Sequence, residues 1–274
     1  MKRAFRIAYD GRPFHGFQRQ PDVPTVENEL FAALATLDIY DPVSESRPTG
    51  YSAAGRTDAG VSAIAQTVTF ECSEWCRPVV FDSELPRSIH VYASTEVTDS
   101  FHATHQASSR QYRYLLMESS LEAERARKAA MRLSGRHDFQ NFSLDTTGTV
   151  RDVSITVESS PPFLVLSVVA DGFPRQFVRR IATVIRGVAS GMRDIDSIDT
   201  LLAGPVRGEH GVAPAPPEPL FLAAVEYPQC EFLIDSQAHS RAVEAIETQY
   251  QQDRLEAGVR AEIAESLRTR AADQ

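Results

Sequence analysis

One aspartate lies in a segment of small residues that could admit a flat ligand. Residues 55–63 read GRTDAGVSA, so Asp58 follows Arg56 by two positions and comes directly before Ala-Gly. Small neighbours leave room for a planar group, and Arg56 could clamp a phosphate or act as a wedge. A carboxylate placed in this way can serve as a nucleophile or a base. The same letters are also typical of a simple turn, because Asp bonds to its own backbone and Gly allows positive φ.

A second group of residues interleaves arginine with tyrosine in a segment typical of a β-strand. Residues 110–114 read RQYRY. Successive side chains in a strand point to opposite faces, so Arg110 and Tyr112 share one face and Arg113 lies on the other. Aromatic rings among arginines form a surface on which bases stack and phosphates bind. The alternative is a half-buried strand with solvated arginines at its edge.

A third group of residues has the spacing of an amphipathic helix. Residues 173–181 read FPRQFVRRI, and Phe177 and Ile181 continue to Val184 and Val188 as an apolar stripe that faces a core. Arg179 and Arg180 begin a separate, basic face. The alternative is that the stems of these arginines cover apolar surface while their charges reach water.

The elements that must position these groups form two successive sets of strands and helices. Strand patterns cover residues 3–9, 64–70, 89–97, 110–117, 151–158, 163–170 and 218–227, and helical patterns cover residues 26–37, 121–133, 173–192 and 198–202. Thr25 is the expected N-cap of the first helix. Segregated strands and helices favour an α+β fold in which helices cover one face of a sheet. We divide the chain into an N-terminal half (1–105), which carries the Asp58 loop, a C-terminal half (106–228) and an extension (229–274).

The extension differs from the rest of the chain in composition. Residues 231–274 contain nine acidic residues and five arginines. Apolar residues from Val243 to Leu267 recur at three- to five-residue steps, which predicts a helix that is interrupted at Gly258. We expect an acidic C-terminal helix that is partly docked or frayed, and a partner-binding role is the alternative.

The net charge is unusual for a protein that binds nucleic acid. The 274-residue chain carries a formal charge of −9, and Lys2 and Lys128 are its only lysines. Phosphate binding requires positive charge, so the arginines must gather in a local cleft. Arginine suits this role because its planar fork matches phosphate and stacks on bases. An acidic, lysine-poor surface also suits a protein that stays hydrated at high salt, so we expect a salt-loving source organism.

Several other functional classes are disfavoured by the composition. The sequence has neither a run of 18 apolar residues nor the apolar region of a signal peptide, so we expect a cytoplasmic protein with no membrane association. Three unevenly spaced cysteines are expected to be free thiols. His102 and His105 form only H-x-x-H, without the context of a metal-dependent hydrolase, so we expect no metal site.

The three groups, together with the segments between them, resemble the tRNA pseudouridine synthase A family. The similarity covers about residues 1–228 and includes, in order, IAYDG (7–11), GFQRQ (16–20), GRTDAGVSA (55–63), FHA (101–103), RQYRY (110–114), GRHDF (135–139), FVRRI (177–181) and VEY (225–227). The departures are modest. Phe17 stands where the family usually has Trp, and Pro219 precedes Leu220 where Gly is common.

The resemblance implies a fold and a set of site residues. The fold is two ferredoxin-like (RRM-like) half-domains that share a continuous, mainly antiparallel sheet, with the catalytic cleft between them. Asp58 matches the catalytic aspartate, Tyr112 the tyrosine that packs against the target base, and Arg179 the basic residue that pairs with the aspartate. Arg56 matches an arginine that enters the RNA stack. RNA binding is also expected of Arg19, Arg110, Arg113 and Arg180.

The resemblance also implies an activity. The family isomerises uridine to pseudouridine in the anticodon stem-loop of tRNA, at positions 38–40, as a homodimer and without a cofactor. The aspartate could attack the base, attack the sugar or remove a ribose proton, and the sequence leaves these routes open. The alternative function is a structured-RNA-binding protein without catalysis.

Overall fold

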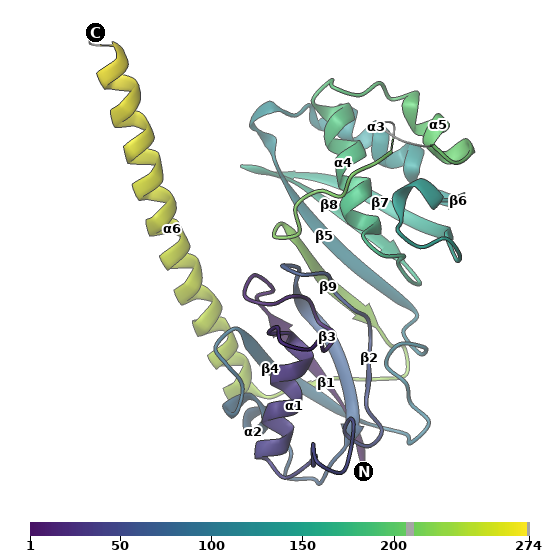
Figure 1. Ribbon diagram of the computed structural model, residues 1–274, viewed down its shortest axis with the longest axis vertical. Coiled ribbons are helices and arrows are strands. Elements are labelled where there is room, and N and C mark those ends of the chain that lie inside the picture. The colour runs from purple at the N-terminus through teal and green to yellow at the C-terminus, as the bar shows by residue number, and fades with distance from the viewer. Residues whose placement is uncertain (207–210, 273–274) are drawn as a thin grey trace.

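The computed structural model describes residues 1–206 and 211–272, and its centre is one large mixed sheet (Figure 1). The strand order is β10-β4-β1-β3-β9-β5-β8-β7-β6, and β2 pairs with β3 outside this path. All pairs are antiparallel except β3 with β9. The strands are β1 (Lys2–Tyr9), β2 (Ser52–Ala53), β3 (Ser62–Glu71), β4 (Ile89–Val97), β5 (Ser109–Met117), β6 (Gly135–Asp138), β7 (Val150–Ser160), β8 (Phe163–Ala170), β9 (Leu220–Glu226) and β10 (Leu233–Ile234). The expected α+β fold with a mainly antiparallel sheet is confirmed.

Helices pack against both ends of this sheet. They are α1 (Val26–Thr36), α2 (Pro78–Ser83), α3 (Ala123–Leu133), α4 (Phe177–Ala189), α5 (Ser197–Ala203) and α6 (Ser236–Ala272). In Figure 1, α1 and α2 lie beside β1, β3 and β4, whereas α3, α4 and α5 lie beside β6, β7 and β8. Phe81 of α2 packs edge-to-face against the stacked rings of Phe5 and Phe70 and so joins α2 to the sheet. Among the described helices, none has the length and apolarity that crossing a bilayer requires.

The two ends of the sheet meet at β9. This strand pairs antiparallel with β5 along most of its length, but it pairs with β3 only through Ser62 and Ala63. The short parallel contact brings the start of β3 close to the middle of the sheet. Because residues 55–61, which carry Asp58, lead directly into Ser62, this junction brings them to the middle of the sheet, next to β9.

The sequence predicted the start of one helix correctly and the start of another wrongly. Thr25 caps α1, since its hydroxyl accepts a hydrogen bond from the Asn28 amide at 3.3 Å. The helix expected over residues 173–192 instead spans only Phe177–Ala189. Gln176 has φ of 63°, a left-handed conformation that cannot continue a helix, so the preceding residues form a loop.

The C-terminal helix α6 is continuous through Gly258, so the expected interruption there is wrong. Its first turns pack against β4 and α2, where Ala238 and Ala242 are buried. Among the described residues, the ion pair of 2.9 Å between Arg12 and Asp253 is the polar contact farthest along α6 that joins it to the rest of the protein. The remainder extends away from the sheet (Figure 1), with its larger apolar side chains exposed.

Candidate active site

The Asp58 loop (residues 55–61) is held in place by buried polar side chains of the sheet. Gln66 of β3 is fully buried and donates to the carbonyl oxygen of the first loop residue at 2.8 Å. The hydroxyls of Tyr9 and Thr57 share a buried hydrogen bond of 2.8 Å. The Phe17 amide donates to the Thr57 carbonyl at 3.0 Å. These anchors fix the residue immediately before Asp58, so the carboxylate is displayed from a rigid backbone.

Two glycines allow the chain to pass closely around Asp58. Gly16 has φ of +98°, and a Cβ there would lie 3.0 Å from the Thr57 carbonyl oxygen. Gly60 has φ of +80°, and its Cβ would lie 3.0 Å from the Pro217 ring. The Val61 amide donates to the Asp58 carbonyl at 3.1 Å and closes a turn. The turn expected from the letters Asp-Ala-Gly is therefore present, and it carries the candidate catalytic residue.

The side chain of Asp58 is paired with Arg179 of α4. The carboxylate Oδ2 accepts a hydrogen bond of 2.9 Å from Arg179 Nη1. Arg179 is oriented by a second bond, from its Nε to the Ala215 carbonyl at 2.7 Å. The Arg179 side chain is 13% exposed and that of Asp58 is 34% exposed. Ion pairs that reach water add little stability, so this one orients the carboxylate more than it stabilises the fold.

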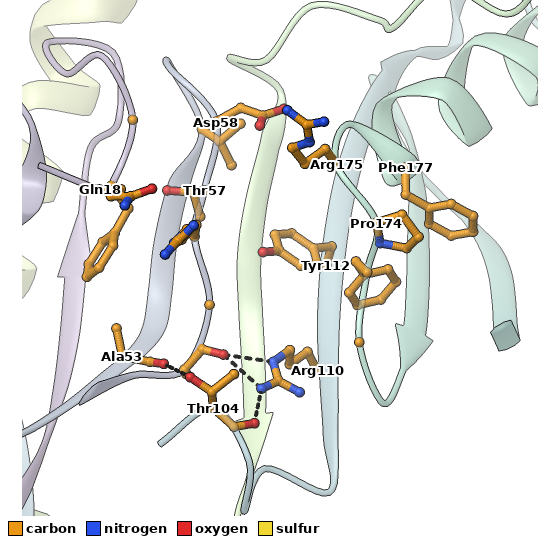
Figure 2. A pocket seen from close by; sticks show the side chains of 18 of the residues that line it. Gln18, Ala53, Thr57, Asp58, Thr104, Arg110, Tyr112, Pro174, Arg175 and Phe177 are labelled. Carbon is orange, nitrogen blue, oxygen red and sulfur yellow. Dashed lines mark hydrogen bonds between the residues drawn. The ribbon is translucent and has the colours of Figure 1, made fainter. Parts of the chain in front are cut away.

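Tyr112 of β5 presents its ring in the same region. The residue is 8% exposed, and its ring meets Phe173 edge-to-face with a centroid distance of 5.1 Å. Figure 2 shows the ring between Thr57 on one side and Pro174 on the other. Burial raises the pKa of the Tyr112 hydroxyl well above its ordinary value, and the charge of Asp58 adds to this effect. The hydroxyl therefore stays protonated at neutral pH.

Asp58, Arg179 and Tyr112 all line one cleft of about 1000 Å³. Its walls come from the first half of the chain, through the segments near residues 15–20 and 51–61, and from the second half, through residues 171–179. Among the described residues that line it, six are arginines and three are acidic. The arginines are Arg47, Arg56, Arg110, Arg151, Arg175 and Arg179. The cleft is thus locally basic in a chain whose net charge is −9.

The other arginines singled out in the sequence lie in different environments. Arg56 is exposed and lines the cleft. Arg19 packs its guanidinium over the Phe31 ring at 5.0 Å, and Arg113 is exposed on the strand face opposite Tyr112. Neither is among the described residues that line the cleft.

Arg180 and Arg110 direct their donors into the protein. Arg180 donates to the Val212 carbonyl and to Gln176, while its Nε is buried without a partner among the described residues. Burial, followed by the charge of Arg179, lowers the pKa of Arg180. Arg110 is 7% exposed and donates to main-chain carbonyls. The contacts of these two side chains are those of structural residues.

Sequence reasoning did not single out three arginines of the cleft. Arg175 is exposed and forms an ion pair with Asp145 at 2.6 Å between Nε and Oδ1. Arg151 donates to the Gly172 carbonyl, and Arg47 lies in the loop before β2. Arg175 lies inside the group of residues 173–181, but the sequence assigned it no role. The other two have no local sequence signal.

Comparison with known proteins identifies close relatives of this chain. Residues 129–228 match a family described as tRNA pseudouridine synthase. The chain is 49% identical to tRNA pseudouridine synthase A of Natronomonas pharaonis over 94% of this chain and 97% of that protein. It is 48% identical to the protein of that name from Halobacterium salinarum, over 88% of this chain and 90% of that protein. It is 38% identical to tRNA pseudouridine synthase A of Methanosarcina acetivorans, over 89% of this chain and 91% of that protein.

Proposed function

The chain belongs to the tRNA pseudouridine synthase A family, and we propose on this premise that it isomerises uridine to pseudouridine in tRNA, with Asp58 as the catalytic residue. The single observation that carries the proposed site is the 2.9 Å contact between Asp58 and Arg179. It fixes one ionisable carboxylate at the wall of a basic cleft large enough for a nucleotide. Tyr112 supplies an aromatic ring in the same cleft.

The proposed reaction requires few catalytic groups from the protein. The N1–C1′ glycosidic bond breaks, the uracil turns, and a bond from C5 to C1′ forms while the C5 proton is lost and N1 gains one. The exchange is neither a redox step nor a hydrolysis, so it balances without a co-reactant. Asp58 serves as the nucleophile or the base. Arg179 holds the carboxylate in one orientation, so the side chain does not have to be ordered when substrate arrives.

The target base must leave its stack before Asp58 can reach the nucleotide, which costs a few kcal/mol. In this proposal the ring of Tyr112 offsets part of that cost by contact with the extruded uracil. Arg56 is exposed at the cleft and takes the vacated place in the RNA stack or contacts the backbone. Recognition of this kind depends on RNA shape and backbone more than on base sequence.

The substrate region and the assembly are further parts of the proposal. Uridines at positions 38–40 of the anticodon arm are the proposed targets, and a homodimer located in the cytoplasm is the proposed active form. The division into halves 1–105 and 106–228 gives each half one wall of the cleft. Positively charged side chains from both walls would then contact the backbone of the same RNA arm.

Replacing Tyr112 with alanine is expected to lower kcat/KM between about 5- and 150-fold. That range corresponds to the loss of about 1–3 kcal/mol of base stacking. Tyr112→Phe is the matched control, because it keeps the ring and removes a hydroxyl that burial holds in its neutral form. Steady-state kinetics on a tRNA transcript measure both variants. An equal loss in both would assign the effect to the hydroxyl and contradict a stacking role.

Salt is expected to weaken binding, and Arg56→Ala is expected to reduce this dependence. A plot of log affinity against log salt should lose about one unit of slope if Arg56 neutralises one phosphate. Arg132→Ala is the control, since Arg132 is paired with Asp196 and Asp199 and does not line the cleft. Fluorescence anisotropy with labelled tRNA measures the slopes. Equal slopes for wild type and Arg56→Ala would remove Arg56 from the RNA interface.

The enzyme proposal and the non-catalytic alternative are separated by one incubation. Purified protein is mixed with an unmodified tRNA transcript, and pseudouridine is detected by chemical labelling and primer extension. We expect pseudouridine in the anticodon arm. Tight binding without any pseudouridine would favour a structured-RNA-binding protein instead.

A further inference from the structure

Arg110 joins three segments of the chain that are distant in sequence. Its Nε and Nη2 donate to the Ala54 carbonyl at 3.0 and 2.8 Å. Nη2 also donates to the Thr104 carbonyl at 2.6 Å, and Nη1 donates to the Asp171 carbonyl. Figure 2 shows Arg110 below Tyr112, with the hydrogen bond from its guanidinium to Thr104. One buried side chain thus fixes three pieces of backbone.

Each of the three acceptors belongs to a different part of the cleft. Ala54 ends the stem of the Asp58 loop, four residues before the carboxylate. Asp171 follows β8 and begins the loop of residues 171–176, which forms the opposite wall and leads into α4 with Arg179. Thr104 lies in the connection between β4 and β5, and its hydroxyl donates to the Ala53 carbonyl. Arg110 therefore ties the wall that carries Asp58 to the wall that leads to Arg179.

The geometry leaves Arg110 little capacity to bind RNA. A guanidinium has five N–H donors in a fixed plane. Four hydrogen bonds to carbonyls occupy most of them, and the residue is only 7% exposed. Lysine cannot replace this function, because an ammonium is a point charge that does not reach three carbonyls in one plane. The position thus requires the shape of arginine as well as its charge.

We propose that Arg110 is a positioning residue that sets the separation of the two cleft walls and so the placement of Asp58 against Tyr112 and Arg179. This inference rests on the proposed function, since its consequence is a rate of isomerisation. Without the guanidinium, the Ala54 and Asp171 segments lose their common support. The loop that carries Asp58 can then shift by a fraction of an ångström to an ångström, while the number of positive charges that line the cleft is unchanged when Arg110 becomes lysine.

Arg110→Lys tests the proposal because it keeps the charge. We expect kcat to fall about 100-fold, the scale of loss caused by a misplacement of about 1 Å. The Kd for tRNA and its salt slope should match wild type, because no phosphate contact is removed. The assays are run well below the melting temperature of each variant, so that unfolded protein does not lower the measured kcat. Millimolar guanidinium added to Arg110→Ala should restore part of kcat, whereas urea, which is planar but neutral, should not.

Two results would overturn the inference. One is a folded Arg110→Lys protein with wild-type kcat. The other is an Arg110→Ala protein whose salt slope falls by about one unit, which would identify a phosphate contact. If Arg110→Lys does not fold, Thr104→Val tests the same junction, because it removes the bond from the Thr104 hydroxyl to the Ala53 carbonyl and keeps Arg110. We expect this variant to lower kcat several-fold with unchanged tRNA affinity. Wild-type kcat would contradict the proposal that the junction of these segments sets the placement of Asp58.

Failure of the proposed function can be told apart from failure of this inference. If the wild-type protein makes no pseudouridine, the proposed function fails. Amide hydrogen exchange then still tests whether Arg110 holds these backbone segments together, because this measurement does not require enzymatic activity. Arg110→Lys should exchange faster than wild type in residues 52–61, in the segment around Thr104 and in residues 171–176, and equally elsewhere. Unchanged exchange in 52–61 and 171–176 would contradict the inference.

Discussion

Replacing Asp58 with asparagine is expected to remove turnover, with a loss of about 10⁴-fold or more in kcat. Asparagine has nearly the same size and keeps an oxygen that can accept from Arg179. It has no nucleophilic or basic oxygen, so the isomerisation has no group to start it. Binding of tRNA should survive, because the change removes a negative charge from a basic cleft. Single-turnover assays with saturating protein measure the chemical step apart from binding.

The control for this experiment is Asp171→Asn, which removes the same charge from the same cleft. Asp171 contacts Arg110 through its main-chain carbonyl, and asparagine retains that group. We expect its single-turnover rate to stay close to that of wild type. A similar loss of rate in both variants would assign the effect to electrostatics of the cleft. Substantial turnover in Asp58→Asn would contradict the catalytic role.

Arg179→Ala is expected to have the next largest effect, a loss of about 10²- to 10³-fold in kcat. The magnitude is that of removing one preorganised donor from an active site. Without the 2.9 Å contact, the Asp58 side chain is free to rotate and its charge lacks a partner. The melting temperature should fall little, because Asp58 is 34% exposed and water can solvate it. Thermal denaturation and single-turnover kinetics of the same preparation measure both quantities.

Arg175→Ala is the matched control for Arg179. It removes an arginine from the same wall, but one that is 67% exposed and paired with Asp145. We expect it to weaken tRNA affinity and to leave the single-turnover rate nearly unchanged. If Arg179→Ala lost stability in proportion to its activity, Arg179 would be a structural residue instead of an orienting one.

The longer helices and strands could be predicted because the spacing of their apolar residues follows the face that is buried. The strand expected at residues 89–97 coincides with β4, and Thr25 was identified as the cap of α1. The shortest elements, β2 and β10, contain two residues each, too few to show a period. The start of α4 was misplaced because Gln176 has a left-handed conformation, which is uncommon for residues other than glycine and was not expected from its sequence.

The site was predictable where residue types act locally and unpredictable where distant segments meet. The small residues around Asp58 predicted a carboxylate that a ligand could approach. Its partner Arg179 lies 121 positions away, so the pairing was expected only from the family resemblance. Strand alternation placed Arg110 and Tyr112 on one face, and both are buried. Alternation cannot show that the carbonyls of Ala54 and Asp171, 56 and 61 positions away, would accept hydrogen bonds from Arg110.

The most direct test is a structure of the Asp58→Asn protein bound to an unmodified tRNA. In the predicted complex, one anticodon-arm uridine has left its stack and lies against Tyr112. Its ring or ribose is within contact distance of residue 58, and Arg179 remains beside that residue. A complex in which every uridine stays stacked, or in which the tRNA binds away from the cleft between residues 55–61 and 171–179, would contradict the account.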